Sequence, residues 1–254
     1  MKKQLITTVA ALFAAFQLNV SAGTTATPTQ TPAPASPVYG SLNLGVGSNH
    51  TYRGQVLDTN PAFEGVLSLH VPVSEGVSLF GQTEQVIASK GTGLFWSKYK
   101  GGVNLTSGRW TFGPGYEAIT NKVKDLTTQS LTLDVYFDDS GLLPVALNPS
   151  LSLGKRVSGK SGTRYEASIE PVLLESGSLK VTVPVAVGVS SNRYYGDAVK
   201  DLSYGYTAAG LAATYKVSKS LSLTGNVLGY NSDAKLNNKN SNFLTSQFGV
   251  EFAF

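Results

Sequence analysis

The chain has 254 residues, of which 14% are charged and 41% are hydrophobic, and it contains no cysteine. A soluble domain usually has about 25% charged residues. The absence of cysteine excludes a disulfide scaffold, a thiolate zinc site, an iron–sulfur cluster and a thiol nucleophile. Beyond the N-terminal region no apolar run reaches about 18 residues, which excludes a helical membrane protein. The net charge of +4 comes from scattered Lys and Arg, so we expect no nucleic-acid partner.

The first 22 residues resemble an export signal. Two lysines follow Met1, an apolar stretch runs from Leu5 to Phe16, and small residues precede a cleavage position after Ala22. This order is typical of a secretory signal peptide; the stretch is too short for a membrane anchor, which needs about 20 apolar residues. Residues 23–37 contain only Gly, Ala, Ser, Thr, Gln and Pro. We predict a signal peptide over 1–22 and a disordered tail over 23–37.

From Tyr39 onward, apolar residues alternate with polar or small ones, the period of β-strands. Twelve runs show this period: 39–48, 60–73, 77–87, 94–106, 110–118, 128–138, 146–157, 163–174, 179–190, 202–215, 221–231 and 242–254. Most of them are longer than the five or six residues common in soluble strands. They suit tilted strands that cross a bilayer, which need about nine to eleven residues.

The connectors between the runs alternate between tight turns and longer polar segments. Tight turns such as Ser74–Gly76 and Ser107–Arg109 alternate with long connections such as Asn49–Asn60 and Ser232–Ser241. Short turns at one end and long loops at the other are typical of outer-membrane barrels. We therefore predict that residues 38–254 form one all-β domain, a transmembrane antiparallel up-and-down barrel of about twelve strands. Ten or fourteen strands are the alternatives, because the connector at 139–145 interrupts the alternation; a soluble sandwich would rarely keep strands this long.

The final run ends with aromatic residues on one face, Phe252 and Phe254 among them. A C-terminal aromatic of this kind resembles the signal by which the bacterial insertion machinery recognises outer-membrane barrels. Other aromatics lie near predicted strand ends and would form interfacial girdles: Tyr39, Phe95, Trp96, Trp110, Tyr116 and Tyr165. These features predict the outer membrane of a Gram-negative bacterium as the location and its lipid bilayer as a partner.

Two stretches resemble a family of largely uncharacterised, porin-like bacterial outer-membrane barrel proteins. The first, Thr51–Val73, has an aromatic-Arg-Gly turn before a strand; the second, Leu147–Glu170, joins an Asn-Pro-Ser-Leu strand to one that begins Tyr-Glu. The resemblance covers about a fifth of the chain and implies the fold and the location. It implies no substrate. The sequence departs from the family pattern at Lys155-Arg156, where an acidic residue is usual.

The sequence offers little for catalysis. A lipid-modifying barrel enzyme would need a Ser/His pair, but the two histidines, His50 and His70, fall in a loop and near the opposite end of a strand. The adjacent carboxylates Asp138 and Asp139 fall in a turn, and no His/Asp/Glu group has metal-ligand spacing. We predict no enzymatic activity, no metal and no cofactor; a lipid-modifying enzyme is the remote alternative.

If the apolar faces meet lipid, charged residues in the strands point inward, because Arg or Lys at the bilayer midplane costs about 2 to 4 kcal/mol. The candidate lumen-facing residues are Glu64, Glu84, Lys98, Lys100, Glu117, Asp134, Arg156, Glu166, Glu170 and Lys180. Acidic residues outnumber basic ones in this set, which predicts mild cation preference in an open lumen. A lumen closed by ion pairs, such as Lys98 or Lys100 with Glu84 or Glu117, is the alternative, because barrels of about eight strands are filled by side chains.

Arg53 stands where the first strand enters its loop, and we single it out as either a pore-mouth contact for an anionic group or an anchor of the loop. The leading functional prediction is a narrow passive channel for small polar solutes. The alternative is a non-conducting structural or surface-binding barrel that acts through its extracellular loops.

Overall fold

The computed structural model describes residues 38–90, 93–122, 126–158, 162–191, 203–234, 236 and 241–254. The predicted signal peptide and the tail at 23–37 lie outside this part of the chain, as does most of the predicted loop at 191–201. Within the described residues no helix is long and apolar enough to span a membrane.

All assigned elements of the described chain are strands, and one antiparallel sheet forms the wall. It contains β1 (Tyr39–Gly47), β4 (Ala62–Ser74), β5 (Val77–Ala88), β6 (Leu94–Ser107), β7 (Trp110–Asn121), β8 (Leu126–Phe137), β9 (Ser150–Arg156), β10 (Thr163–Ile169), β11 (Val172–Ser176), β12 (Leu179–Thr182), β13 (Val185–Ser191), β14 (Ser203–Lys216), β15 (Leu221–Ser232) and β16 (Asn242–Ala253). The remaining two, β2 (His50–Tyr52) and β3 (Gln55–Asp58), pair only with each other.

Two wall strands are each interrupted at a proline. Pro171 separates β10 from β11, and Pro184 separates β12 from β13. Proline has no N–H to donate to a ladder, so a strand is locally broken where it occurs. When each interrupted pair is counted as one strand, the wall has twelve strands.

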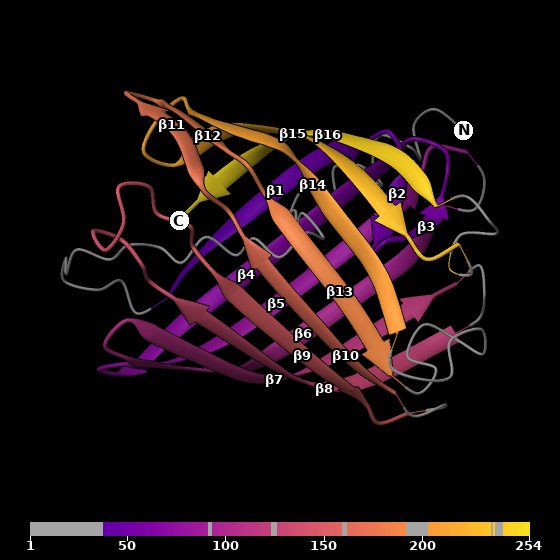
Figure 1. The fold of residues 1–254 in the computed structure, drawn as a ribbon, viewed down its shortest axis with the longest axis horizontal. Coiled ribbons are helices and arrows are strands. Elements are labelled where there is room, and N and C mark those ends of the chain that lie inside the picture. The colour runs from indigo at the N-terminus through magenta and orange to yellow at the C-terminus, as the bar shows by residue number, and fades with distance from the viewer. Residues whose placement is uncertain are drawn as a thin grey trace.

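The sheet closes on itself. β1 pairs with β4 on one side and with β16 on the other, and β14 pairs with β15. The amide of Gly40 donates to the carbonyl of Phe254 at 2.8 Å, and the amide of Phe254 donates back at 3.0 Å. Figure 1 shows the tilted strands running in chain order around the barrel. The predicted closed antiparallel barrel of twelve strands is confirmed.

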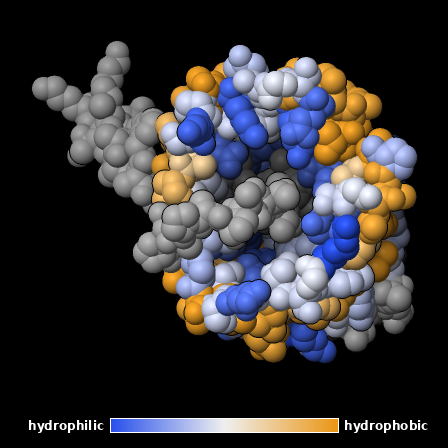
Figure 2. Space-filling model, turned by 90° about the vertical axis from the view of Figure 1, so that its left-hand side faces the viewer, coloured by the Kyte–Doolittle hydropathy of each residue, from blue (hydrophilic) through white to orange (hydrophobic). Residues whose placement is uncertain are grey.

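The wall has an apolar outer face and a polar inner face. Exposed side chains on its outside include Phe63, Leu131, Leu211 and Phe248, each with 54% to 58% of its surface exposed. Figure 2, seen from the end that holds Phe254, shows hydrophobic residues around the outer circumference and hydrophilic residues around the opening. This distribution is the reverse of a soluble protein and is the one required of a barrel that crosses a bilayer.

The irregular connector after β8 is organised by Asp139. Its carboxylate accepts hydrogen bonds from the amides of Leu147 at 2.7 Å and Asn148 at 3.0 Å. Asn148 has a positive φ of 48°, which is incompatible with regular strand geometry at this residue. The strand predicted from residue 146 therefore begins only at Ser150, and the count of twelve is unaffected.

Close packing between β14 and β15 depends on Gly210. A Cβ atom there would lie 2.0 Å from the carbonyl oxygen of Val227 and 2.8 Å from Cα of Leu228. We expect Gly210→Ala to lower the free energy of unfolding by about 1 to 3 kcal/mol, because the added methyl forces the two strands apart. Urea unfolding of the refolded barrel in lipid vesicles measures this change. Gly81→Ala is the matched control, since a Cβ at Gly81 meets nothing within 4 Å. Equal losses of unfolding free energy in the two variants would show that the close contact at Gly210 does not affect stability.

Candidate constriction inside the barrel

The first long connection folds back as a small hairpin, β2–β3. Tyr52 pairs with Gln55, so Arg53 and Gly54 form a two-residue turn. Both have positive φ, 49° and 74°, as the central residues of a type I′ turn do. Glycine adopts this conformation at no cost. The aromatic-Arg-Gly sequence thus makes a tight tip that presents the Arg53 side chain and the Gly54 carbonyl.

The tip of the hairpin touches opposite sides of the barrel. Arg53 donates a hydrogen bond of 2.8 Å to Glu117 on β7. The next residue, Gly54, accepts a hydrogen bond of 2.8 Å from Ser232 on β15. In the ring of twelve strands, β7 and β15 are separated by six steps in either direction. The hairpin therefore bridges the interior instead of projecting from the end of the barrel.

The tip lies directly against the wall at Tyr206. A Cβ atom on Gly54 would be 2.4 Å from Cβ of Tyr206, which leaves room for glycine alone. Tyr206 is fully buried, and its hydroxyl donates to Glu166 on β10. Its ring in turn occupies the space over Gly188 on β13, where a Cβ would lie 2.4 Å from the ring. The side chain is thus pressed flat between the hairpin and the wall.

The base of the hairpin is fixed at His50. Its Nδ1 lies 2.8 Å from one carboxylate oxygen of Glu64, and Gln247 donates to the other oxygen at 2.6 Å. The imidazole packs against the rings of Phe95 and Trp96, with centroids 5.6 Å and 4.9 Å away. Only 1% of His50 is exposed. His50 therefore belongs to the first long connection, as the sequence indicates, but its side chain is buried inside the barrel.

Arg53 and Glu117 form a buried ion pair, with side chains 8% and 2% exposed. Arg53 also lies over the ring of Tyr52, 4.3 Å from its centroid, and the Tyr52 hydroxyl donates to Glu117 at 3.3 Å. The structure thus places the Arg53 side chain inside the barrel, paired with Glu117 and stacked on Tyr52.

Charged side chains of alternating sign line the wall that Arg53 contacts. Lys98 on β6 pairs with Glu84 on β5 at 2.5 Å. Lys100, also on β6, pairs with Asp134 on β8. We call these two pairs, together with Arg53–Glu117, the ion-pair belt. Within the belt each charge faces an opposite one, which is the arrangement a buried charge requires.

Arg164 on β10, which is not among the predicted lumen-facing residues, extends this arrangement. It is 2% exposed and donates to Ser152 at 3.0 Å, while Ser152 donates to Asp134 at 2.7 Å. Arg164 lies two residues before Glu166 on β10, and residues two apart in a strand point to the same side of the sheet. The inward position of Arg164 could therefore be predicted from that of Glu166.

The ten predicted lumen-facing residues differ in the burial of their side chains. Glu64, Glu84, Lys98, Glu117, Asp134 and Glu166 are buried, whereas Lys100, Arg156, Glu170 and Lys180 are half-buried. Glu170 accepts a hydrogen bond of 2.6 Å from Thr182. At the end of the last strand, Phe252 and Phe254 are 41% and 60% exposed.

Three aromatics expected in an interfacial girdle lie elsewhere: Tyr39, which stacks on His70 of the inner face, and the consecutive pair Phe95 and Trp96. Phe95 and Trp96 are only 2% and 1% exposed and pack in one cluster with Ala62 and Val86. A β-bulge between Val86 and Ile87 inserts an extra residue into β6 at this point, and a bulge allows consecutive side chains to leave the strict alternation. Strand periodicity alone cannot locate such a bulge.

On the opposite side of the interior, the described buried side chains of β13, β14 and β15 are uncharged, and the carboxylates of Glu166 on β10 and Glu64 on β4 border them. There the cluster of Ala186, Tyr206, Ala208, Leu228 and Tyr230 covers β13, β14 and β15, and Phe243 stacks on Tyr230. The interior is therefore divided between a charged wall on β5 to β8 and an uncharged wall.

A narrow gap remains between the hairpin and the uncharged wall. It measures about 30 Å³, enough for about two water molecules. It is lined by Gly47, Asn49, Thr51, Glu64, Asn226, Leu228, Tyr230, Thr245, Ser246 and Gln247. Glu64 is its charged member.

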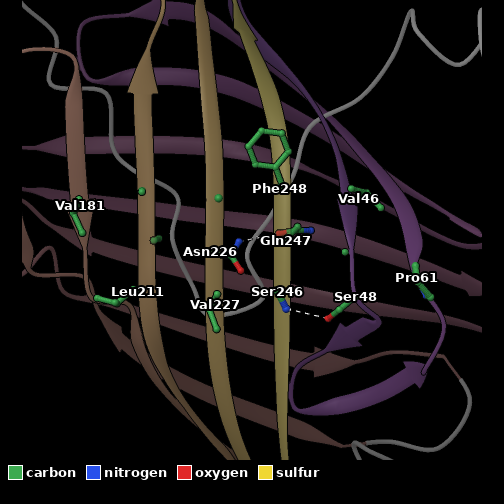
Figure 3. A pocket seen from close by; sticks show the side chains of 14 residues that line it. Val46, Ser48, Pro61, Val181, Leu211, Asn226, Val227, Ser246, Gln247 and Phe248 are labelled. Carbon is green, nitrogen blue, oxygen red and sulfur yellow. Dashed lines mark hydrogen bonds between the residues drawn. The ribbon is translucent and has the colours of Figure 1, made fainter.

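A larger depression of about 720 Å³ lies on the outside of the same strands. Figure 3 shows its apolar side chains Val46, Leu211, Val227 and Phe248. These are 40% to 58% exposed and belong to the apolar outer face. This depression therefore faces the bilayer, and it shares Gly47, Asn226, Ser246 and Gln247 with the lining of the interior gap.

No family model and no curated protein matches this chain. Solved structures do share its fold. The COG4313 outer membrane channel from Pseudomonas putida F1 is 9% identical, with 91% of this chain and 100% of that chain covered and a TM-score of 0.55. A protein from a study of in-meso crystallization of membrane proteins is 12% identical over 85% and 84% of the two chains, with a TM-score of 0.52. The KdgM porin is 12% identical over 85% and 99%, with a TM-score of 0.45.

These likenesses show the fold of outer-membrane barrels, as the sequence predicted. The resemblance of the two sequence stretches to one particular barrel family stays a prediction.

Removal of Arg53 would leave Glu117 buried without its ion-pair partner. We expect Arg53→Met to lower the free energy of unfolding by about 3 kcal/mol, the cost typical of breaking a buried pair. Urea unfolding of the refolded barrel measures the change. Arg109→Met is the matched control, because Arg109 is exposed and its guanidinium contacts only the Asp138 and Ser140 carbonyls among the bonds described. A loss no larger than that of the control would contradict the buried-pair assignment.

Proposed function

We propose that the protein is an outer-membrane barrel through which small polar solutes cross passively, and that hairpin β2–β3 forms its constriction. The observation that carries this proposal is the bridge made by Arg53 and Gly54 between β7 and β15. A barrel of about eight strands is filled by side chains, whereas one of sixteen leaves a channel. With twelve strands, an inward-folded loop gives an interior that is narrowed but still polar. The shared fold with an outer membrane channel supports the proposal.

The proposed orientation places the tight turns in the periplasm and the long connections outside the cell. Short periplasmic turns and longer extracellular loops are the rule in this class of barrel. Both ends of the barrel chain then lie on the periplasmic side, where Gly40 and Phe254 are hydrogen-bonded to each other. Phe252 and Phe254 are exposed there, as contact with the insertion machinery would require.

The positions of the two histidines favour a channel over a lipid-modifying enzyme. His50 is buried inside the barrel beside Glu64, and His70 stacks on Tyr39 with ring centroids 5.1 Å apart. A lipid-modifying site would need an activated Ser/His pair on the lipid-facing surface. Both histidines instead lie among residues of the inner face.

Planar-bilayer recording of the purified, refolded protein tests the proposal directly. A steady current in a salt gradient is the expected result. Absence of current from protein that is folded, as judged by heat-modifiable mobility and protease resistance, would contradict a channel and shift the function to the extracellular loops as a surface-binding barrel.

Displacement of the hairpin should widen the channel. We expect Gly54→Ala to raise the single-channel conductance, because the added methyl overlaps Tyr206 and moves the tip away from the wall. Gly93→Ala is the matched control: Gly93 also has a positive φ, 77°, but a Cβ there meets nothing within 4 Å. Equal conductance in the two variants would mean that the hairpin does not limit the current.

A further inference from the structure

We propose that permeating ions and small polar solutes cross the constriction along the wall formed by β15, β16, β1 and β4, where Glu64, Asn226 and Gln247 set the selectivity, and that the ion-pair belt lies outside this route. The inference rests on the proposed channel function. Of the three residues to which it assigns the selectivity, only Glu64 is among the charged residues predicted to face the lumen.

Among the described residues, one gap beside the hairpin lies away from the ion-pair belt. The gap of about 30 Å³ lies between Asn49 and Thr51, at the start of the hairpin, and the wall residues Asn226 and Gln247. Its lining contains none of the six belt residues. Those residues lie on β5 to β8 and at the hairpin tip, where the tip is joined to the wall by the Arg53–Glu117 pair.

The charges of the ion-pair belt are buried and paired with one another. Lys98 and Glu84 are 7% and 2% exposed at their side chains, and each is bound to the other. Glu117 is bound by Arg53 and Tyr52. A charge that is buried and paired has little effect on an ion that passes elsewhere, because its field is largely cancelled by its partner. The belt therefore holds the hairpin against the wall and does not coordinate the permeating ion.

The lining of the gap contains amide side chains and one carboxylate. Asn226 donates to Gln247 at 3.0 Å, and Gln247 donates to Glu64 at 2.6 Å, which orders the two amides and one carboxylate in a row. Figure 3 shows Asn226 and Gln247 facing each other from neighbouring strands. Amide groups offer both donors and acceptors to a polar solute, and one carboxylate favours cations. We thus expect neutral polar solutes and monovalent cations to pass more readily than anions.

The test introduces a negative charge by isosteric substitution, either in the lining of the gap or on the charged wall across the hairpin. We expect Asn226→Asp and Gln247→Glu to raise the potassium-to-chloride permeability ratio roughly fivefold, measured from reversal potentials in a KCl gradient. Asn121→Asp is the matched control, since Asn121 is an inner residue of β7, 8% exposed, on the charged wall. Recording at about pH 8 keeps introduced carboxyls ionised.

Asn121→Asp is expected to keep the wild-type permeability ratio. A shift in Asn121→Asp equal to that in Asn226→Asp would place the route along the belt and overturn the inference. Unchanged ratios in both Asn226→Asp and Gln247→Glu, in channels that conduct, would overturn it as well. If neither the wild type nor any variant conducts, the proposed channel function fails, and this inference fails with it; the two failures are therefore distinguishable.

Discussion

The hydrogen bonding of the backbone in hydrocarbon is the constraint on which the whole structure depends. No water is available there to pair an exposed N–H or C=O group, so a sheet that crosses a bilayer has to close. Pairing of β1 with both β4 and β16 meets this requirement and holds Gly40 against Phe254. Once the sheet is closed, period two places every second side chain inside, where charged residues have to find partners.

The hairpin and the ion-pair belt are two parts of one solution to that packing problem. A twelve-stranded barrel has more interior than its wall side chains fill. The hairpin occupies part of it, and Arg53 supplies the positive charge that Glu117 needs when buried. Uncharged residues such as Tyr206 and Leu228 cover the opposite wall. Among the described residues this packing leaves a gap of about 30 Å³ beside the hairpin, on the side away from the ion-pair belt.

Much of this fold was predictable from the sequence, for a physical reason. A lipid-facing wall imposes strict alternation over long strands, so strand number, approximate bounds and the inward set could be derived from period two. Deviations come from local features without a periodic signal: the bulge that buries Phe95 beside Trp96, and the Asp139 carboxylate that delays β9. The inward position of Arg164 was available from the alternation.

The sequence by itself determined the closed barrel and the segregation of polar from apolar residues, because both follow from local periodicity and the chemistry of lipid. Only the tertiary structure decided which charges meet and where space remains. Arg53 and Glu117 are 64 residues apart in the chain, and Gly54 and Ser232 are 178 apart. Their contacts arise from ring closure and from the direction in which one hairpin folds, and neither is encoded by the spacing of residues along a strand.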